Sequence, residues 1–240
     1  MKKFDLSSAG LHILAMGFML MDHLWATVVP GNDWMTAVGR LAFPIFAFLI
    51  VEGYFHTRSL KKYKQRLLLG AVISEIPFNL MCSGRLFFPI HQNVLWTFLL
   101  ALMLIQWNER LKDAPPLRRW IRWAASLAIG FLVGTLTMVD YYGYGAMMVL
   151  VFYFFRGQAW WQRLGQFAGL FWINWQLMGG LVYEWGAFTI PQQGFAVLAL
   201  IPIFLYRGRK GLDSKAFRNF CYLFYPAHML LLALLGNLIR

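Results

Sequence analysis

Charge is scarce in this chain of 240 residues. Charged residues make up 13% of it, hydrophobic residues make up 60%, and Asp and Glu together number only ten. A soluble domain of this length would need many more charged side chains to cover its surface. The shortage excludes an ordinary soluble enzyme, and the positive mean hydropathy of +0.55 predicts a membrane protein whose main solvent is lipid.

Other features are missing too. The chain has two cysteines, Cys82 and Cys221, which we expect near opposite faces of the membrane and therefore unbridged. Neither has a second ligand at metal-binding spacing, so no metal is expected. There is no long linker, internal repeat, low-complexity tail or signal-peptide cleavage site. These absences predict a single integral-membrane domain over residues 1–240.

Apolar segments fill most of the chain, and a window of about 20 residues, the length that crosses a bilayer, separates nine of them. They lie near residues 8–29, 35–55, 66–83, 92–107, 120–138, 141–156, 163–180, 194–206 and 219–238. The fourth, sixth and eighth are short, which favours tilted, broken or re-entrant helices. We expect an all-α polytopic membrane protein, a single bundle of about nine transmembrane helices, with eight to ten spans compatible with the pattern.

The basic residues indicate an orientation, because loops that stay in the cytoplasm retain Lys and Arg. With nine spans and a cytoplasmic N-terminus, the inner side receives 19 of the 22 basic residues, and the outer side receives only Arg85 and Arg240. The net charge of +12 is therefore mainly an orientation signal with attraction to anionic lipid, and nucleic acid is not an expected partner.

Ionisable residues inside apolar segments are the best candidates for function, because each costs at least about 2 kcal/mol to place in a membrane. They are His12, Asp22, His23, Arg40, Glu52, Glu75 and His228. Uncharged or peripheral polar neighbours accompany them: Asn79, Asn93, Thr97, Asp140, Asn174, Gln193 and Tyr225.

His12 and His23 lie eleven residues apart, which on an α-helix is about three turns and returns to nearly the same face. One stripe of the first segment therefore carries two imidazoles, with His12 toward the cytoplasm. The alternative is that each ring is only hydrogen-bonded in a packed interface.

Arg40 precedes Pro44 by four residues, so the proline leaves the carbonyl of Arg40 without its helical donor. This predicts a kink with an arginine at its hinge, suited to holding an anion, or else an Arg40–Asp22 pair that serves packing. Glu75 and Asn79 flank Pro77, where structural hydrogen bonding is the favoured interpretation.

Two further stretches bring polar groups to the bundle. "FRNFCYLFYPAHMLLLALL" presents Tyr225 and His228 at helical spacing, with His228 in mid-span. Asp140, in "VDYYGYG", is expected to cap a helix, with a substrate-side role as the alternative.

Six stretches together resemble the TraX family over most of the chain. They are "MDHL", "GRLAFPIFAFLIVEGY", "YKQRLLLGAVISEIPFN", "NVLWTFLLAL", "DYYGYGAMMVLVFYF" and "FYPAHMLLLALL". TraX proteins are linked to N-terminal acetylation of conjugative pilin and are distantly similar to the acyltransferase 3 superfamily. That superfamily has a basic residue, ten others and then a His in its first span, and this spacing is kept here by His12 and His23.

The resemblance implies acetyl transfer from cytoplasmic acetyl-CoA to an extracytoplasmic amine or hydroxyl, such as a pilin N-terminus or a glycan, across a bacterial inner membrane. His23 would be the general base, Asp22 or another carboxylate would set its tautomer or pair with Arg40, and Arg40 or His228 would stabilise the oxyanion. His12 would contact the donor. The polar head of CoA would lie among a group of basic residues that follows the second segment: Arg58, Lys61, Lys62, Lys64 and Arg66.

Two alternatives remain open. A proton-coupled transporter or flippase would use the same ionisable residues as a relay without covalent transfer, and an assembly factor would keep them as a degenerate site. Five polar residues are assigned to the substrate side or to structure: Glu75, Asn79, Asn93, Asp140 and Tyr225.

Overall fold

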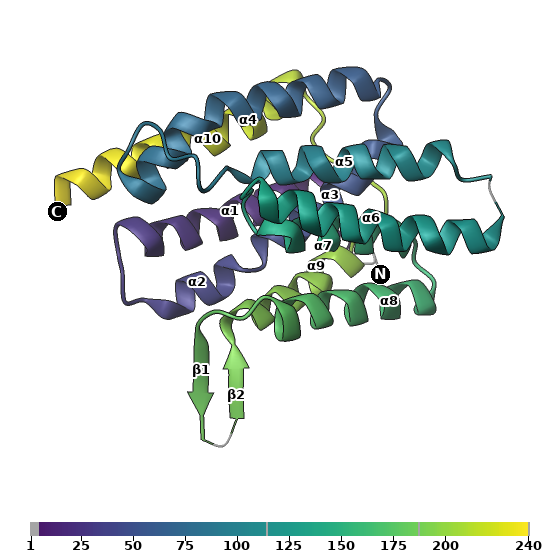
Figure 1. Ribbon diagram of the computed structural model, residues 1–240. Coiled ribbons are helices and arrows are strands. Elements are labelled where there is room, and N and C mark those ends of the chain that lie inside the picture. The colour runs from purple at the N-terminus through teal and green to yellow at the C-terminus, as the bar shows by residue number, and fades with distance from the viewer. Residues whose placement is uncertain (1–4, 114, 187, 240) are drawn as a thin grey trace.

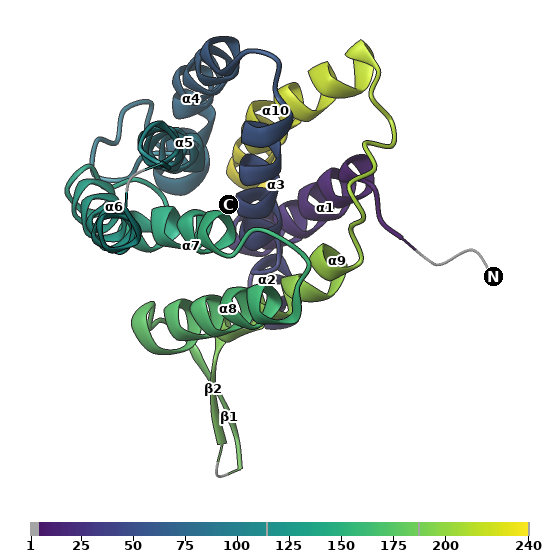
Figure 2. The same ribbon diagram turned by 90° about the vertical axis from the view of Figure 1, so that its right-hand side faces the viewer.

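A computed structural model describes residues 5–113, 115–186 and 188–239, and it consists of helices and one small hairpin (Figures 1 and 2). The first half contains α1 (Ser8–Thr27), α2 (Asp33–Gly39), α3 (Ala42–His56), α4 (Leu60–Ser83), α5 (Val94–Arg110) and α6 (Pro116–Leu136). The second half contains α7 (Tyr142–Phe154), α8 (Trp160–Phe171), η1 (Trp172–Leu177), β1 (Val182–Trp185), β2 (Phe188–Pro191), η2 (Gln192–Ala199), α9 (Leu200–Phe204) and α10 (Lys215–Ile239).

Polar residues fix where several helices begin. Ser7 accepts a hydrogen bond from the backbone N–H of Gly10, and Asn93 accepts one from that of Leu95, so each side chain caps the helix that follows it. α4 ends at Gly84, which takes the left-handed conformation (φ 68°) that favours glycine at a helix C-terminus. Local sequence therefore sets these boundaries.

The second predicted segment is divided into two helices. α2 ends at Gly39 and α3 begins at Ala42, with Arg40 and Leu41 in the turn between them. Pro44 falls in the first turn of α3, where a missing N–H leaves no helical hydrogen bond unmade. The break is the kink predicted from the Arg40–Pro44 spacing, and it places Arg40 at the joint.

Four helical stretches are long and apolar enough to cross a membrane: Ser8–Thr27, Asp33–His56, Leu60–Ser83 and Lys215–Leu238. Two shorter apolar helices are Tyr142–Phe154 and Gln192–Phe204. Leu69 is 61% exposed, and Val72, Ile73 and Ile76 are exposed along the same helix, as expected for a face that meets lipid. The chain is a membrane protein. Each of the nine predicted segments overlaps a helix, while the number of spans stays a prediction.

α7 is the most enclosed helix and forms the centre of the bundle together with α3. Small residues bring α6 against it: a side chain at Gly143 would overlap the backbone of Phe131, and one at Gly134 would lie 2.8 Å from the carbonyl oxygen of Tyr142. A buried helix need not present a full lipid-facing length. This position explains why α7 has only 13 residues.

A β-hairpin is the exception to the predicted all-α class. β1 and β2 pair antiparallel, with Tyr183 opposite Ile190, and project away from the helices at the bottom of Figures 1 and 2. The hydroxyl of Tyr183 donates to the carbonyl oxygen of Asp33 (2.9 Å), at the start of α2. The stretch "VYEWGAFTIP" combines β-branched and aromatic residues around a glycine, which is the composition of a hairpin.

Candidate functional site

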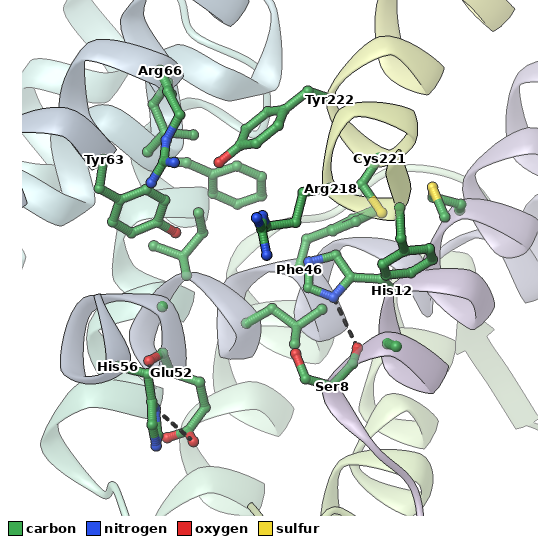
Figure 3. Close-up of a pocket in the computed structure, with 18 of the residues that line it drawn as sticks. Ser8, His12, Phe46, Glu52, His56, Tyr63, Arg66, Arg218, Cys221 and Tyr222 are labelled. Carbon is green, nitrogen blue, oxygen red and sulfur yellow. Dashed lines mark hydrogen bonds and ion pairs between the residues drawn. The ribbon is translucent and has the colours of Figure 1, made fainter. Parts of the chain in front are cut away.

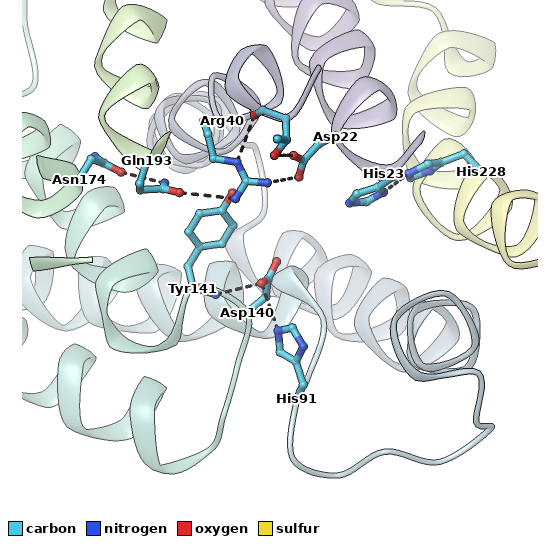
Figure 4. Close-up of polar contacts among 10 residues, drawn as sticks. Asp22, His23, Arg40, His91, Asp140, Tyr141, Asn174, Gln193 and His228 are labelled. Carbon is cyan, nitrogen blue, oxygen red and sulfur yellow. Dashed lines mark hydrogen bonds and ion pairs between the residues drawn. The ribbon is translucent and has the colours of Figure 1, made fainter. Parts of the chain in front are cut away.

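A histidine pair joins the first and last helices. The Nδ1 atom of His23, on α1, lies 2.7 Å from Nε2 of His228, on α10, and the two ring planes differ by 7°. Nδ1 of His228 lies 2.7 Å from the carbonyl oxygen of Phe224. Two mid-segment histidines, 205 residues apart in sequence, therefore form one unit (Figure 4).

The partners of His228 determine where the protons lie when both rings are neutral. A carbonyl oxygen only accepts, so Nδ1 of His228 must donate to Phe224. Its Nε2 then has no proton and accepts one hydrogen bond from Nδ1–H of His23. The remaining nitrogen, Nε2 of His23, keeps a lone pair. The pair therefore offers one base, and it belongs to His23.

Asp22 faces away from this pair and toward α2. Its carboxylate is paired with the Arg40 guanidinium and accepts a hydrogen bond from the hydroxyl of Thr36 at 2.6 Å. The side chain of Asp22 occupies the space that a Cβ on Gly39 would need, so the glycine lets α2 approach α1. Asp22 was predicted to pair with either His23 or Arg40, and in the structure it pairs with Arg40. The side chain that orients His23 is that of His228.

Arg40 links this carboxylate to the far side of the bundle (Figure 4). Its Nη1 donates to Gln193 at 3.5 Å, and the amide nitrogen of Gln193 donates to Asn174 at 3.0 Å. Its Nε donates to the carbonyl oxygen of Thr36 at 3.4 Å. The arginine carries five N–H donors, and three of its bonds are accounted for within the described residues, so it retains donor capacity.

A second ion pair lies in the loops at the same end of the bundle. Nε2 of His91 lies 3.3 Å from Asp140, and the hydrogen bond to this carboxylate raises the pKa of His91 above its ordinary value although partial burial opposes the rise. Asp140 also accepts from the backbone N–H of Tyr141 at 3.1 Å. Tyr141, not Asp140, is the N-cap of α7, and it has no capping side chain. The predicted helix cap is therefore wrong.

Glu75 and the two asparagines hold the C-terminal half of α4 in place. Asn93 donates to Glu75 and to the carbonyl oxygen of Ala71 (2.8 Å), and the indole N–H of Trp96 donates to Glu75 at 3.0 Å. Asn79 donates to the carbonyl oxygen of Leu86 at 3.3 Å. These bonds support the structural interpretation. Tyr225 is buried in an apolar cluster that includes Met19 and Phe78.

A cavity of about 380 Å³ opens at the end of the bundle where α1, α4 and α10 begin and α3 ends. We call it the main cavity. Figure 3 shows His12, Arg66 and Arg218 around the same space. Its innermost lining includes Met19 and Phe224, which precede His23 and His228 by four residues, or one helical turn. The main cavity therefore leads from the basic loops toward the histidine pair.

Only one residue of the predicted basic docking group lines this cavity. Arg66 does, with its guanidinium 5.9 Å from the ring centre of Tyr222. Lys64 instead donates to Gln106 at 2.8 Å. The remaining members lie outside the lining: Arg58, Lys61 and Lys62. These residues are neighbours in the sequence, and the fold separates them.

Two other cations take their place at the mouth. Lys210 and Arg218 line the main cavity, and both pair with Asp213, at 3.7 Å and 2.5 Å. The Arg218 hydrogen bond lowers the pKa of Asp213 below its ordinary value. Sequence reasoning missed Lys210 and Arg218, although their stretch "RGRKGLDSKAFR" is as basic as the one after α3. Only the packing of α10 against α4 shows that they face the cavity.

The chain is similar to known proteins over nearly its whole length. The protein family described as TraX protein matches residues 7–236. The chain is also 29% identical, over 251 residues that cover 96% of each chain, to a protein of Dichelobacter nodosus described as "Probable fimbrial assembly protein FimC, serogroup H1". No solved structure matches the chain.

Proposed function

This chain belongs to the TraX family, and from the geometry of its site we propose that it is a membrane acyltransferase. It would move an acetyl group from acetyl-CoA, entering at the basic end, to an amine or hydroxyl that reaches His23 from the opposite end. The observation that carries the proposal is the main cavity, whose inner wall lies one helical turn from a histidine pair with one available base.

The donor enters where the cations are. The diphosphate of acetyl-CoA would lie among Arg66, Lys210 and Arg218 at the mouth, because guanidinium and ammonium groups bind phosphate through charge-assisted hydrogen bonds. The pantetheine arm would pass His12, which lines the same cavity, and deliver the thioester toward His23. These histidines are eleven positions apart on α1, a rise of about 16 Å.

The chemistry needs one base and one group that stabilises negative charge. Nε2 of His23 takes the proton of the acceptor as its nitrogen or oxygen bonds to the acetyl carbon, the carbon–sulfur bond breaks, and the protonated His23 returns that proton to the departing thiolate. His228 orients His23 and is fully engaged at both nitrogens. Arg40 retains N–H donors and is therefore our candidate for the oxyanion.

The relatives suggest the class of acceptor. A relative described as a fimbrial assembly protein and the TraX membership support a pilin-type subunit, modified at its N-terminal amine on the outer side of a bacterial inner membrane. We assign this orientation from the basic loops, with nine spans and a cytoplasmic N-terminus. A glycan hydroxyl would require the same base and opening.

The test is to purify the protein, add acetyl-CoA with a pilin-derived peptide, and measure free CoA by thiol detection and the peptide by mass spectrometry. The proposal expects release of CoA together with a peptide heavier by one acetyl group. Envelope material from cells with and without the gene would identify the natural acceptor by the same mass increment. Acetyl-CoA that stays intact with every acceptor would overturn the assignment.

The second candidate is a proton-coupled transporter, and the histidine pair is the observation that favours it. Two imidazoles joined by a hydrogen bond within apolar helices can pass a proton between the two ends of the bundle. A transporter would show substrate uptake driven by a pH gradient in proteoliposomes and no binding of acetyl-CoA. Acetyl-CoA binding with thioester cleavage separates the two functions.

A further inference from the structure

A second cavity at the basic end is not used by the proposed function. It has a volume of about 250 Å³ and lies between the end of α3, the turn after α7, α8 and the segment after α9. Three arginines line it, Arg156, Arg163 and Arg207, together with the polar side chains of Gln158 and Gln166. We call it the arginine pocket.

The guanidinium groups of Arg163 and Arg207 carry uncompensated charge, whereas that of Arg156 does not. Arg156 pairs with Glu52 at 2.9 Å and lies 4.1 Å from the centre of the Phe55 ring. Arg163 lies 5.1 Å from the centre of the Phe204 ring, and Arg207 donates to the neutral side chain of Gln158 at 3.2 Å. Within the described residues, neither Arg163 nor Arg207 forms an ion pair. The pocket therefore has a net positive charge that attracts an anion.

The arginine pocket adjoins the main cavity. Both are lined by Glu52, His56, Tyr206 and Gly208. At Gly208 no atom lies within 4 Å of the position where a side chain would begin, so there is open space beside this shared residue. One elongated ligand can therefore occupy both spaces, with different anionic groups in each.

We propose that the arginine pocket binds a phosphate monoester, and, resting on the proposed function, that its occupant is the 3′-phosphate of CoA. The diphosphate would lie at Arg66, Lys210 and Arg218, and the separate monoester would reach Arg163 and Arg207. A monoester carries about −2 charge near neutral pH, and arginine binds phosphate oxygens in pairs through its planar N–H groups. The pocket would select CoA over carriers that lack this phosphate.

The test compares ligands that differ only in that phosphate. Calorimetry on the full chain, in nanodiscs of phosphatidylcholine, measures Kd for CoA, for dephospho-CoA and for adenosine 3′,5′-bisphosphate. The wild type should bind CoA about tenfold or more tightly than dephospho-CoA, the effect of losing a charge-assisted hydrogen bond. Arg163→Gln should weaken binding of CoA by a similar factor and leave dephospho-CoA unchanged.

Arg118→Gln is the matched control, because Arg118 is exposed at the same end of the bundle and lies outside both cavities. It should change neither constant. Equal affinity of the wild type for CoA and dephospho-CoA would overturn the proposal, as would an equal loss for both ligands in Arg163→Gln.

The remaining outcomes distinguish a failure of the phosphate site from a failure of the proposed function. If CoA does not bind but adenosine 3′,5′-bisphosphate binds in an Arg163-dependent way, the phosphate site stands and the proposed function fails. If neither binds, the phosphate site is overturned. Nanodiscs that contain phosphatidic acid test a lipid headgroup as the source: Arg163-dependent enrichment of that lipid, with no effect on CoA, would overturn the nucleotide assignment.

Discussion

At the scale of single residues, the roles of His23 and His228 differ because His228 has both nitrogens occupied. His23→Ala should lower acetyl transfer by about 100-fold to 10,000-fold, the usual loss of a general base, while acetyl-CoA still binds. Initial rates and Kd measured on the same preparation check this. If His23→Ala keeps near-wild-type turnover and His228→Ala has none, the base is on α10.

In the proposed mechanism His228 acts through His23, so its test needs a substitution that keeps the acceptor. The amide oxygen of Gln can replace Nε2 as the acceptor for His23, whereas Phe fills the space without accepting a hydrogen bond. His228→Gln should therefore keep much more of kcat than His228→Phe, with similar KM for acetyl-CoA in both. Equal activity in the two variants would reduce His228 to a packing residue.

Arg66 and Arg58 offer a matched pair from one basic stretch, since only Arg66 lines the main cavity. Arg66→Gln should raise KM for acetyl-CoA by about tenfold with little change in kcat, because a charged hydrogen bond to the donor is lost. Arg58→Gln should leave KM unchanged. A larger effect at Arg58 would show that the donor's phosphates lie outside the cavity.

The His91–Asp140 pair makes stability depend on pH. The raised pKa of His91, caused chiefly by the hydrogen bond to Asp140, means that the folded state holds a proton more tightly than the unfolded chain, whose pKa is about 6.5. The stabilisation is complete below that pH and is lost as the pH rises through the folded value. It amounts to at most about 1 kcal/mol for a partly exposed pair. Between about pH 6 and about pH 9, the thermal midpoint of the wild type should therefore fall by more than that of His91→Gln.

Polar residues inside apolar segments could be predicted as site residues from the sequence, whereas polar residues in loops could not. His23, Asp22, Arg40 and His228 interrupt apolar segments, where polar groups are costly and therefore conspicuous. His91 lies in a loop, where a polar residue is ordinary and gives no such signal. The hydrogen bond between His23 and His228 joins the two ends of the chain, so no local pattern could predict it.

At the scale of secondary-structure elements, the approach of α6 to α7 depends on glycine. Gly143→Ala would place a methyl group on the backbone of Phe131, and such overpacking costs about 1–3 kcal/mol. The variant should have a lower thermal midpoint by fluorescence-detected size exclusion. Gly17→Ala is the control, because no atom lies within 4 Å of the added carbon on α1. A loss of equal size at Gly17 would point to a general effect of the substitution.

The helices and the break between α2 and α3 could be predicted from the sequence, whereas the hairpin was missed. Apolar runs located the helices, and the Arg40–Pro44 spacing located the break between α2 and α3. The β1–β2 hairpin lies between the predicted segments 163–180 and 194–206, because a window of membrane length passes over two strands of four residues each. A search for alternating residues around a glycine would have found it.

At the scale of the whole molecule, the arrangement of the loops supports a definite topology. The N-terminal segment lies against the stretch that follows α9: Leu6 pairs with Tyr206, and the N–H groups of Ser8 and Ala9 donate to the carbonyl oxygens of Arg209 and Lys210. Figure 1 shows the end of α10 at the left of the bundle, away from the loops that precede α4, α6 and α8. The basic loops therefore gather at one end, and the C-terminus lies away from them.

We predict that this basic end is cytoplasmic and that the C-terminus is outside, because loops rich in Lys and Arg are retained in the cytoplasm. Alkaline phosphatase fused after residue 239 should be active, since it matures only outside, and a fluorescent protein fused there should be dark. The same reporters inserted at Gly157, in the turn after α7, should give the reverse pattern. Fluorescence at both positions would contradict this topology, because it would place the end of α10 and the turn after α7 on the same side of the membrane.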